Sequence, residues 1–353
     1  MKNLKKLFSV FILTLAAAAV LCSCSGGEKQ SLKVYNAGEY IDTALLTKFE
    51  KEFNAKVIYE TFDSNESMYT KVASGEQYDV IIPSDYMIER LIKEDMLLEI
   101  DKTKLKNLDG IKKEVMDLRF DPGNKYSVPY FWGTVGILYN KNVVDKKDLE
   151  TEGWNILKDT KYKGDIFMYD SERDSFMVAL KSLGYSLNTE NTAEFDEAYK
   201  WLVDQKNTMD PIIVGDDVID NMISGNKSMA IVYSGDAAYI MSENGDMEYF
   251  EPKEGTNFWV DGMVIQKGSK QVDLAHSFID FMIREDNAEA NSEKVGYSSA
   301  VEEAFNKMKE GTYKGISAYT PRTEYEKDED FGYQKPEIKK YSAELWTKVK
   351  SQQ

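Results

Sequence analysis

The chain has 353 residues, 42% of them apolar, so its length favours two domains and its composition excludes an intrinsically disordered protein. Its 61 acidic and 44 basic residues give a net charge of −17, opposite in sign to that of a typical nucleic-acid-binding protein. Two cysteines near the N-terminus and a single histidine exclude disulfide scaffolds, cysteine-zinc sites, paired-histidine metal motifs and thiol catalysis from the remainder of the chain.

The N-terminus has the pattern of a bacterial export signal. Three lysines precede an apolar run of 15 residues, which is short for a membrane-spanning helix and typical of a signal peptide. The run ends at Cys22, Ser23 and Cys24, and this end resembles a lipobox, in which a small residue precedes the lipidated cysteine. Because Ser23 is small, Cys24 is the predicted lipidation site; an ordinary secretory signal with incidental cysteines is the alternative. We therefore predict a signal peptide over residues 1–23, a lipidated tether over residues 24–30, and a body held to a bacterial membrane by its lipid.

Strand-like and helical patterns alternate in the first part of the body. Strands are predicted at residues 32–36, 56–62 and 78–82, and helical patterns follow them over residues 41–53, 64–74 and 87–97. This order predicts a mostly parallel sheet covered by helices. In such folds ligands bind beyond the carboxyl ends of the strands, which points to residues 37–40 and 84–86 as parts of a site.

A run of aromatic and β-branched residues over 126–140 is predicted to cross into a second lobe. The α/β pattern then resumes, with strands at residues 165–169 and 229–233 and helices over residues 174–183 and 193–205 and after Gly235. A strand at residues 258–266 is predicted to return to the first lobe, and helices are predicted over residues 271–293 and 336–350.

The sequence lacks the common catalytic motifs, and His276 falls within an apolar-periodic helix, which favours a packing role. Aromatic residues instead lie beside acids after predicted strands, as in Glu39-Tyr40, Ser84-Asp85-Tyr86, Tyr233-Ser234-Gly235-Asp236 and Trp259-Val260-Asp261. Aromatic faces and carboxylates together suit an organic polycation; the alternative is that the aromatics are core and the acids are surface. Trp259 and Asp261 favour a site, because alternate strand residues share a face and an acid beside a Trp is poor core material.

Several separated segments resemble one family, the extracytoplasmic spermidine/putrescine-binding proteins of polyamine ABC importers. The segments are residues 35–40 (YNAGEY), 64–69 (SNESMY), 78–86 (YDVIIPSDY), 126–133 (YSVPYFWG), 252–261 (PKEGTNFWVD) and 295–297 (VGY). The similarity runs in the same order from about residue 31 to the C-terminus and weakens after residue 300.

The resemblance implies two α/β lobes, each a mixed, mostly parallel sheet with covering helices, joined by a hinge and holding a polyamine in the cleft between them. The first lobe would comprise residues 31–137 and 261–305, and the second residues 138–260 and 306–353. The resemblance also implies a monomer without cofactor, metal or enzymatic activity, which delivers its ligand to ABC permease subunits served by a separate ATPase. The implied ligand-binding residues are Tyr40, Ser84, Tyr86, Asp174, Tyr233, Asp236, Trp259, Asp261 and Tyr297.

One position departs from the family: Ala37 stands where a Trp is common, whereas Asp236 matches an acid of the putrescine-binding branch. Loss of a stacking wall should cost a long polyamine more than a short one, so we predict that putrescine binds at least comparably to spermidine. The alternatives are a receptor of the same fold for another solute, such as a sugar, ferric ion or thiamine, and a secreted hydrolase using a carboxylate pair.

Overall fold

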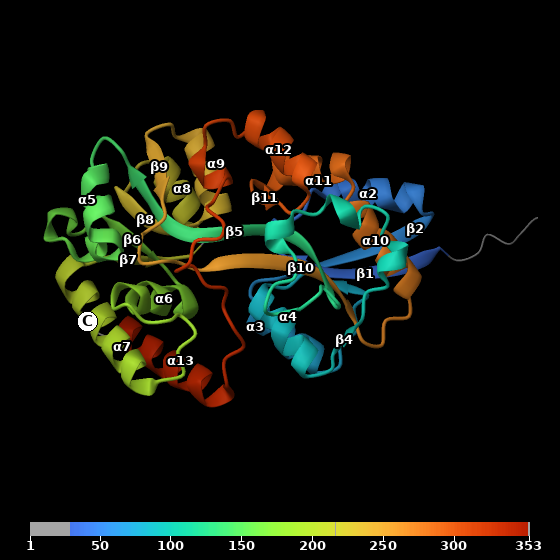
Figure 1. The fold of residues 1–353 in the computed structure, drawn as a ribbon, viewed down its shortest axis with the longest axis horizontal. Coiled ribbons are helices and arrows are strands. Elements are labelled where there is room, and N and C mark those ends of the chain that lie inside the picture. Colours follow the sequence, from blue (N-terminus) through green and yellow to red (C-terminus); the bar gives the residue numbers. More distant parts are fainter. Residues whose placement is uncertain (1–28, 216, 352–353) are drawn as a thin grey trace, which may run out of the picture.

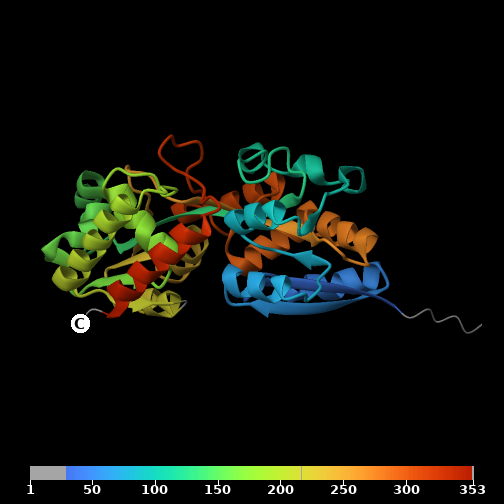
Figure 2. The same cartoon turned by 90° about the horizontal axis from the view of Figure 1, so that it is seen from below.

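The computed structural model describes residues 29–215 and 217–351, which form two lobes side by side along the long axis of the molecule (Figures 1 and 2). The predicted signal peptide, most of the tether and Cys24 lie outside the described residues. No helix within the described ranges is long and apolar enough to cross a membrane.

The first lobe is built on three parallel strands, with β1 between β2 and β3, and the antiparallel strand β10 continues the sheet beyond β3. Helices cover both sides of this sheet, so β1 and β3 are largely buried. Its strands are β1 (Gln30–Ala37), β2 (Ala55–Phe62), β3 (Val80–Ile81), β4 (Leu97–Leu98), β10 (Phe258–Gln266) and β11 (Ser298–Ser299). Its helices are α2 (Thr43–Glu52), α3 (Asn65–Ala73), α4 (Asp85–Lys93), α10 (Val272–Met282), α11 (Glu285–Val295) and α12 (Glu302–Glu310).

The second lobe has a mixed sheet in which β6 pairs in parallel with both β7 and β8. Its strands are β6 (Ile166–Tyr169), β7 (Ile212–Val214), β8 (Met229–Tyr233) and β9 (Met247–Phe250). Its helices are α5 (Lys146–Glu152), α6 (Glu172–Ser182), α7 (Thr192–Met209), α8 (Val218–Ile223), α9 (Ser234–Glu243) and α13 (Pro336–Ser351). Short 3-10 turns occur in both lobes, at Lys102–Lys104, Leu108–Gly110, Lys113–Val115, Gly153–Lys158, Thr160–Tyr162 and Ser317–Tyr319.

One long strand, β5 (Ser127–Asn140), belongs to both lobes, as predicted for residues 126–140. Up to Thr134 it pairs with β10 of the first lobe, and from Val135 onward it pairs with β8 and β9 of the second. Its interior residues are buried on both faces, which explains its nearly uninterrupted apolar and aromatic sequence. Because the strand changes partners there, we propose that the lobe boundary on β5 lies between Thr134 and Val135.

The single helix predicted over residues 271–293 is wrong, because α10 ends at Met282 and α11 begins at Glu285, with Ile283 and Arg284 between them. Arg284 is extended, with φ −67° and ψ 139°, and this turn places its guanidinium 2.8 Å from a carboxylate oxygen of Glu52. Ile283 is buried at the break, so the apolar pattern continues while the helix axis does not.

Candidate ligand-binding site

The predicted site residues converge where the lobes meet, at strand ends and at the first turns of helices. Asp174 and Asp236 lie in the first turns of α6 and α9, and Ser84 is the N-cap of α4. The partial positive charge of a helix N-terminus stabilises a carboxylate in the first turn. This local effect explains why acids occupy these positions.

Three tyrosines each donate a phenolic hydrogen bond to one of the three predicted acids. Tyr40 donates to Oδ2 of Asp261 at 2.6 Å, and Tyr233 donates to Oδ2 of Asp174 at 2.7 Å. The third pair joins the lobes, because Tyr297 of the first donates to Oδ1 of Asp236 in the second at 2.7 Å. A phenol supplies one proton, so each carboxylate keeps further acceptor capacity.

The aromatic rings of the site form a continuous series across the junction. The Tyr297 ring lies 5.3 Å from that of Tyr40 and 5.5 Å from that of Trp259. Trp259 in turn lies 6.2 Å from Tyr233, edge to face. Gly133, opposite Trp259 on β5, makes room for this indole, since a Cβ there would lie 2.6 Å from it. The series offers aromatic surface from both lobes to a ligand held between them.

Two of the acids have a buried oxygen that no protein group satisfies. Within the described residues, Oδ1 of Asp174 and Oδ1 of Asp261 are buried without a hydrogen-bond partner, as is the indole nitrogen of Trp259. An unpaired buried polar atom is costly, so such atoms at one junction indicate a site that a ligand completes. The carboxylate oxygens suit N–H donors that carry positive charge.

Burial raises the pKa of Asp261 to about 6, although the hydrogen bond from Tyr40 and the nearby Ser84 side chain both favour its charged form. Burial also raises the pKa of Asp174, although the hydrogen bond from Tyr233 and the nearby Ser171 side chain favour its charged form. Both carboxylates are therefore held in an environment that penalises their charge, and a cationic ligand would relieve the penalty.

Ser84 and Tyr86 take part differently from the other predicted residues. The Ser84 backbone bridges to Asp261, while its hydroxyl accepts a hydrogen bond from Asn65 at 3.0 Å. Tyr86 stands apart from the aromatic series, and the guanidinium of Arg173 covers one face of its ring at 3.9 Å. That face is occupied by the protein itself, which leaves only the other face to a ligand.

Two residues next to predicted ones were missed. Asp85 is 1% exposed and accepts hydrogen bonds from the backbone N–H of Tyr86 at 2.6 Å and of Val260 at 3.2 Å, so it fixes α4 to β10. Arg173 links the lobes through Tyr86. The signal available in sequence was their position beside Tyr86 and Asp174, but their partners are distant in the chain.

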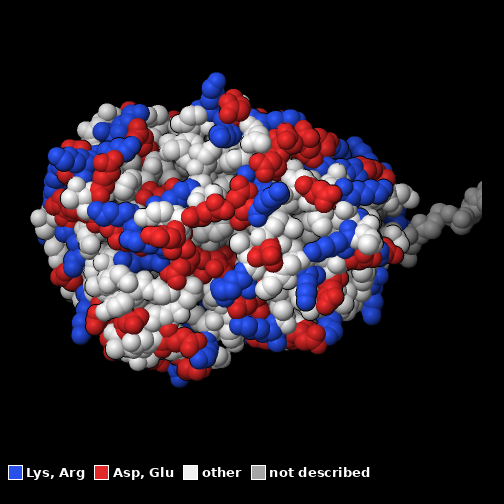
Figure 3. Space-filling view, viewed as in Figure 1, with Lys and Arg blue, Asp and Glu red and all other residues white. Residues whose placement is uncertain are grey.

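Acidic side chains also gather on the surface near the middle of the face in Figure 3, close to the line where the lobes meet. Lysines and arginines are spread over both lobes. Such a field raises the local concentration of cationic solutes. The described residues contain no group of three or more His, Cys, Asp or Glu side chains that could hold a metal ion.

Most of the chain is similar to known proteins. Residues 44–315 match the family described as bacterial extracellular solute-binding protein. The chain is 34% identical over 297 residues to the spermidine/putrescine-binding periplasmic protein of Salmonella typhimurium, covering 83% of this chain and 84% of that protein. It is 32% identical over 304 residues to the putrescine/cadaverine-binding protein of Pseudomonas aeruginosa, covering 83% and 84%. A solved structure described as a putative spermidine/putrescine ABC transporter from Listeria monocytogenes superposes with a TM-score of 0.83 at 40% identity, covering 92% of this chain and 99% of that one.

Proposed function

The chain belongs to the family of bacterial extracellular solute-binding proteins, and on that premise we propose that it captures a polyamine between its lobes for an ABC importer. The observation that carries the proposal is the pair of buried, unpartnered carboxylate oxygens on Asp174 and Asp261, set among aromatic rings. At neutral pH each amine of a polyamine is protonated, so ammonium groups can donate to these oxygens. Trp259 and the tyrosines would cover the methylene groups and add cation–π attraction.

The proposed cycle follows from contacts to both lobes. A ligand that binds Asp261 on the first lobe and Asp174 on the second favours the closed arrangement over the open one. The closed protein would then dock on membrane permease subunits, while a separate ATPase supplies the energy. In this role the protein acts as an extracytoplasmic monomer that releases its ligand chemically unchanged.

A calorimetric titration with putrescine, spermidine and an uncharged sugar tests the proposal. We expect heat and saturation with the polyamines and none with the sugar, because the sugar cannot neutralise the two carboxylates. Saturation with the sugar alone would instead favour a receptor of the same fold for another solute. Recovery of the polyamine chemically altered would favour the hydrolase alternative.

Selectivity is expected to depend on Asp236 and Ala37. Asp236→Ser should weaken putrescine binding more than spermidine binding, because it removes an acid near one end of the proposed ligand site, which would favour a closely spaced terminal ammonium group. Ala37→Trp should strengthen spermidine binding by restoring a stacking wall at the end of β1. Competition titrations of the two variants measure both ratios. A wild-type protein that binds spermidine strongly and putrescine barely at all contradicts this prediction but not the polyamine receptor.

Affinity is expected to fall as the pH drops through about 6, the pKa of Asp261. Below that pH the carboxylate is protonated and must lose its proton to bind an ammonium group, which costs about tenfold in affinity per pH unit. The amines stay charged over this range, so the dependence belongs to the protein. Titrations between pH 5 and 7.5 measure the slope, and Asp261→Asn should flatten it. An equally steep slope in Asp261→Asn would assign the titration to another group.

We also propose that a lipid on Cys24 holds the protein at the membrane. Cys24→Ala should prevent incorporation of a labelled fatty acid and release the protein from the membrane fraction. Cys22→Ala is the matched control and should leave anchoring intact. Labelled fatty acid retained on the Cys24→Ala variant contradicts the assignment.

A further inference from the structure

Within the described residues, three segments cross between the lobes, and they meet at one place. The first is β5 at Thr134 and Val135, and the second is the stretch that leads from β9 through Thr256 into β10. The third follows the turn at Ser317–Tyr319, which is bonded to the first lobe, and reaches the second lobe at Arg322. Any movement of one lobe against the other must bend these three segments together.

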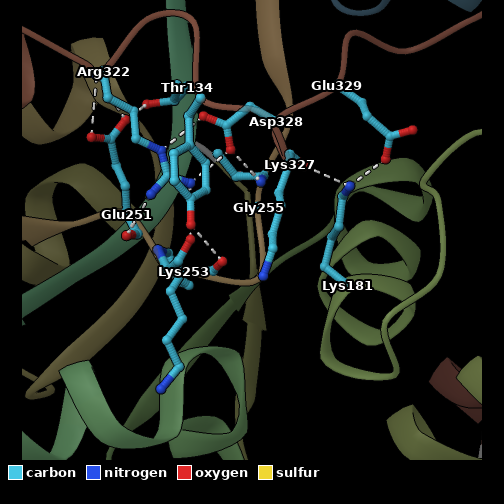
Figure 4. A network of polar contacts seen from close by, with 12 residues as sticks. Thr134, Lys181, Glu251, Lys253, Gly255, Arg322, Lys327, Asp328 and Glu329 are labelled. Atoms are coloured by element: carbon cyan, nitrogen blue, oxygen red, sulfur yellow. Dashed lines mark hydrogen bonds and ion pairs between the residues drawn. The ribbon is translucent and has the colours of Figure 1, made fainter.

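The carboxylate of Glu251 joins the first crossing to the third. It accepts a hydrogen bond from the hydroxyl of Thr134 at 2.7 Å. Both of its oxygens lie 3.2 Å from the backbone N–H of Arg322, which donates to them. Figure 4 shows this carboxylate between the two segments.

The guanidinium of Arg322 and the carboxylate of Asp328 connect the second crossing to the other two. Two guanidinium nitrogens donate to the two oxygens of Asp328 at 2.8 and 2.6 Å. Asp328 also accepts from the backbone N–H of Thr256 at 2.8 Å, and the Thr256 hydroxyl donates to the carbonyl of Val135 at 2.6 Å. All three crossings are therefore bonded into one network (Figure 4).

Much of the network is shielded from water, whereas Glu251 and Arg322 are partly exposed. Thr134 and Thr256 are fully buried, and the side chain of Asp328 is 5% exposed in its bidentate ion pair. Burial raises the pKa of Glu251 against the hydrogen bond from Thr134. Buried charged hydrogen bonds of this geometry are directional, so the network favours one arrangement of the three segments.

The third crossing is also connected to the binding site, through Lys327 and Glu329, which follow Arg322 in the chain. The ammonium group of Lys181, near the end of α6, donates to the carbonyl of Lys327 at 2.8 Å and pairs with Glu329. The first turn of α6 carries Asp174. The position of the third crossing is thereby coupled through one helix to a proposed ligand-binding carboxylate.

We propose that Glu251, Arg322 and Asp328 are positioning residues that hold the three interlobe crossings in register and so set how readily the lobes close. The proposal rests on the proposed function only in taking a polyamine as the ligand that closes the lobes. None of the three residues takes part in the Tyr–Asp pairs or the aromatic series of the site. Loosening the network should therefore weaken every ligand by the same factor, since it lowers the fraction of binding-competent protein.

Glu251→Gln, Arg322→Lys and Thr134→Val test this in the full chain. Each keeps side-chain size and removes a charge, a bidentate contact or one hydroxyl donor, so at least one variant should remain folded. We expect the Kd for putrescine and for spermidine to rise by the same factor, about five- to fiftyfold, with their ratio unchanged. Arg284→Lys is the matched control, because it alters an ion-paired arginine inside the first lobe and should leave both Kd values unchanged.

Hydrogen exchange of the unliganded protein separates this proposal from the proposed function. We expect faster exchange at all three crossings in the variants and unchanged exchange at them in Arg284→Lys. If the wild type binds no polyamine, the proposed function fails. The hydrogen-exchange rates at the three crossings would still test whether the network holds the crossings in register. A lower melting temperature with unchanged exchange at the crossings and unchanged Kd values would make the network merely structural. A loss confined to one polyamine would make these residues ligand contacts; either result overturns the proposal.

Discussion

Replacing Asp261 with Asn should weaken polyamine binding by about 1.5–3 kcal/mol, roughly ten- to 150-fold in Kd, while the unliganded protein becomes more stable to heat. The two effects have one cause. Oδ1 of Asp261 is buried without a partner, so in the absence of ligand its charge is a cost, whereas an ammonium group turns it into a charged hydrogen bond. Asn keeps an oxygen acceptor for Tyr40, removes the charge, and replaces the unpartnered oxygen by an amide NH2 that cannot accept from an ammonium group.

The stability change has a definite pH range. Because burial raises the pKa of Asp261 to about 6, the folded protein binds a proton there that the unfolded chain releases near pH 4. The neutral acid therefore stabilises the fold at low pH, and that contribution is lost as the pH rises from about 4 to 6. Above pH 6 the wild type bears the full cost of the buried charge, and the gain in Asp261→Asn should be largest there.

Calorimetry and thermal unfolding at pH 7.5 and pH 4.5 measure both effects. Asp109→Asn, at an exposed position far along the chain from the site residues, is the control and should change neither quantity. Asp174→Asn should behave like Asp261→Asn, since its Oδ1 is also buried and unpartnered. Unchanged polyamine affinity in both Asp261→Asn and Trp259→Ala contradicts the proposed site.

The fold was predictable where local pattern and tertiary structure agree. Strand and helix alternate as predicted in the first part of the body, and the long apolar run at residues 126–140 predicted the strand shared by both lobes. The parallel character was overestimated, because β5 and β10 pair antiparallel with their neighbours. Direction of pairing depends on where distant segments meet, which periodicity does not record.

The types of residue in the candidate site could be predicted from the sequence, but which residues pair with one another could not. Aromatics beside acids indicated a cationic ligand, but the partners of Tyr40 and Tyr233 lie 221 and 59 residues away in the chain. In the same way, nothing local predicts that the guanidinium of Arg173 covers one face of the Tyr86 ring. The network of Glu251, Arg322 and Asp328 left no signal in the sequence, because Glu251 and Arg322 are single charged residues 71 positions apart.

Gly235→Ala should weaken the binding of every polyamine, roughly five- to 150-fold. The glycine has no side chain to bind a ligand, and its role is to leave room for the ring of Tyr297. Gly235 lies on α9 of the second lobe, and a Cβ there would stand 2.3 Å from ring atoms of Tyr297 in the first lobe. Neither group can yield alone, because Tyr297 is held by its hydrogen bond to Asp236 and by the rings of Tyr40 and Trp259.

The overlap is between lobes, so the least costly relief is to part them, which leaves each lobe folded and opposes closure. We therefore expect an unchanged melting temperature for the unliganded variant and equal losses for putrescine and spermidine by calorimetry. Gly245→Ala is the matched control on the same lobe, because its Cβ would meet nothing within 4 Å. Wild-type affinity in Gly235→Ala would mean that Tyr297 and α9 do not meet in the ligand-bound protein. The polyamine affinity of Gly235→Ala therefore tests whether Gly235 and Tyr297 are in close contact when the ligand is bound.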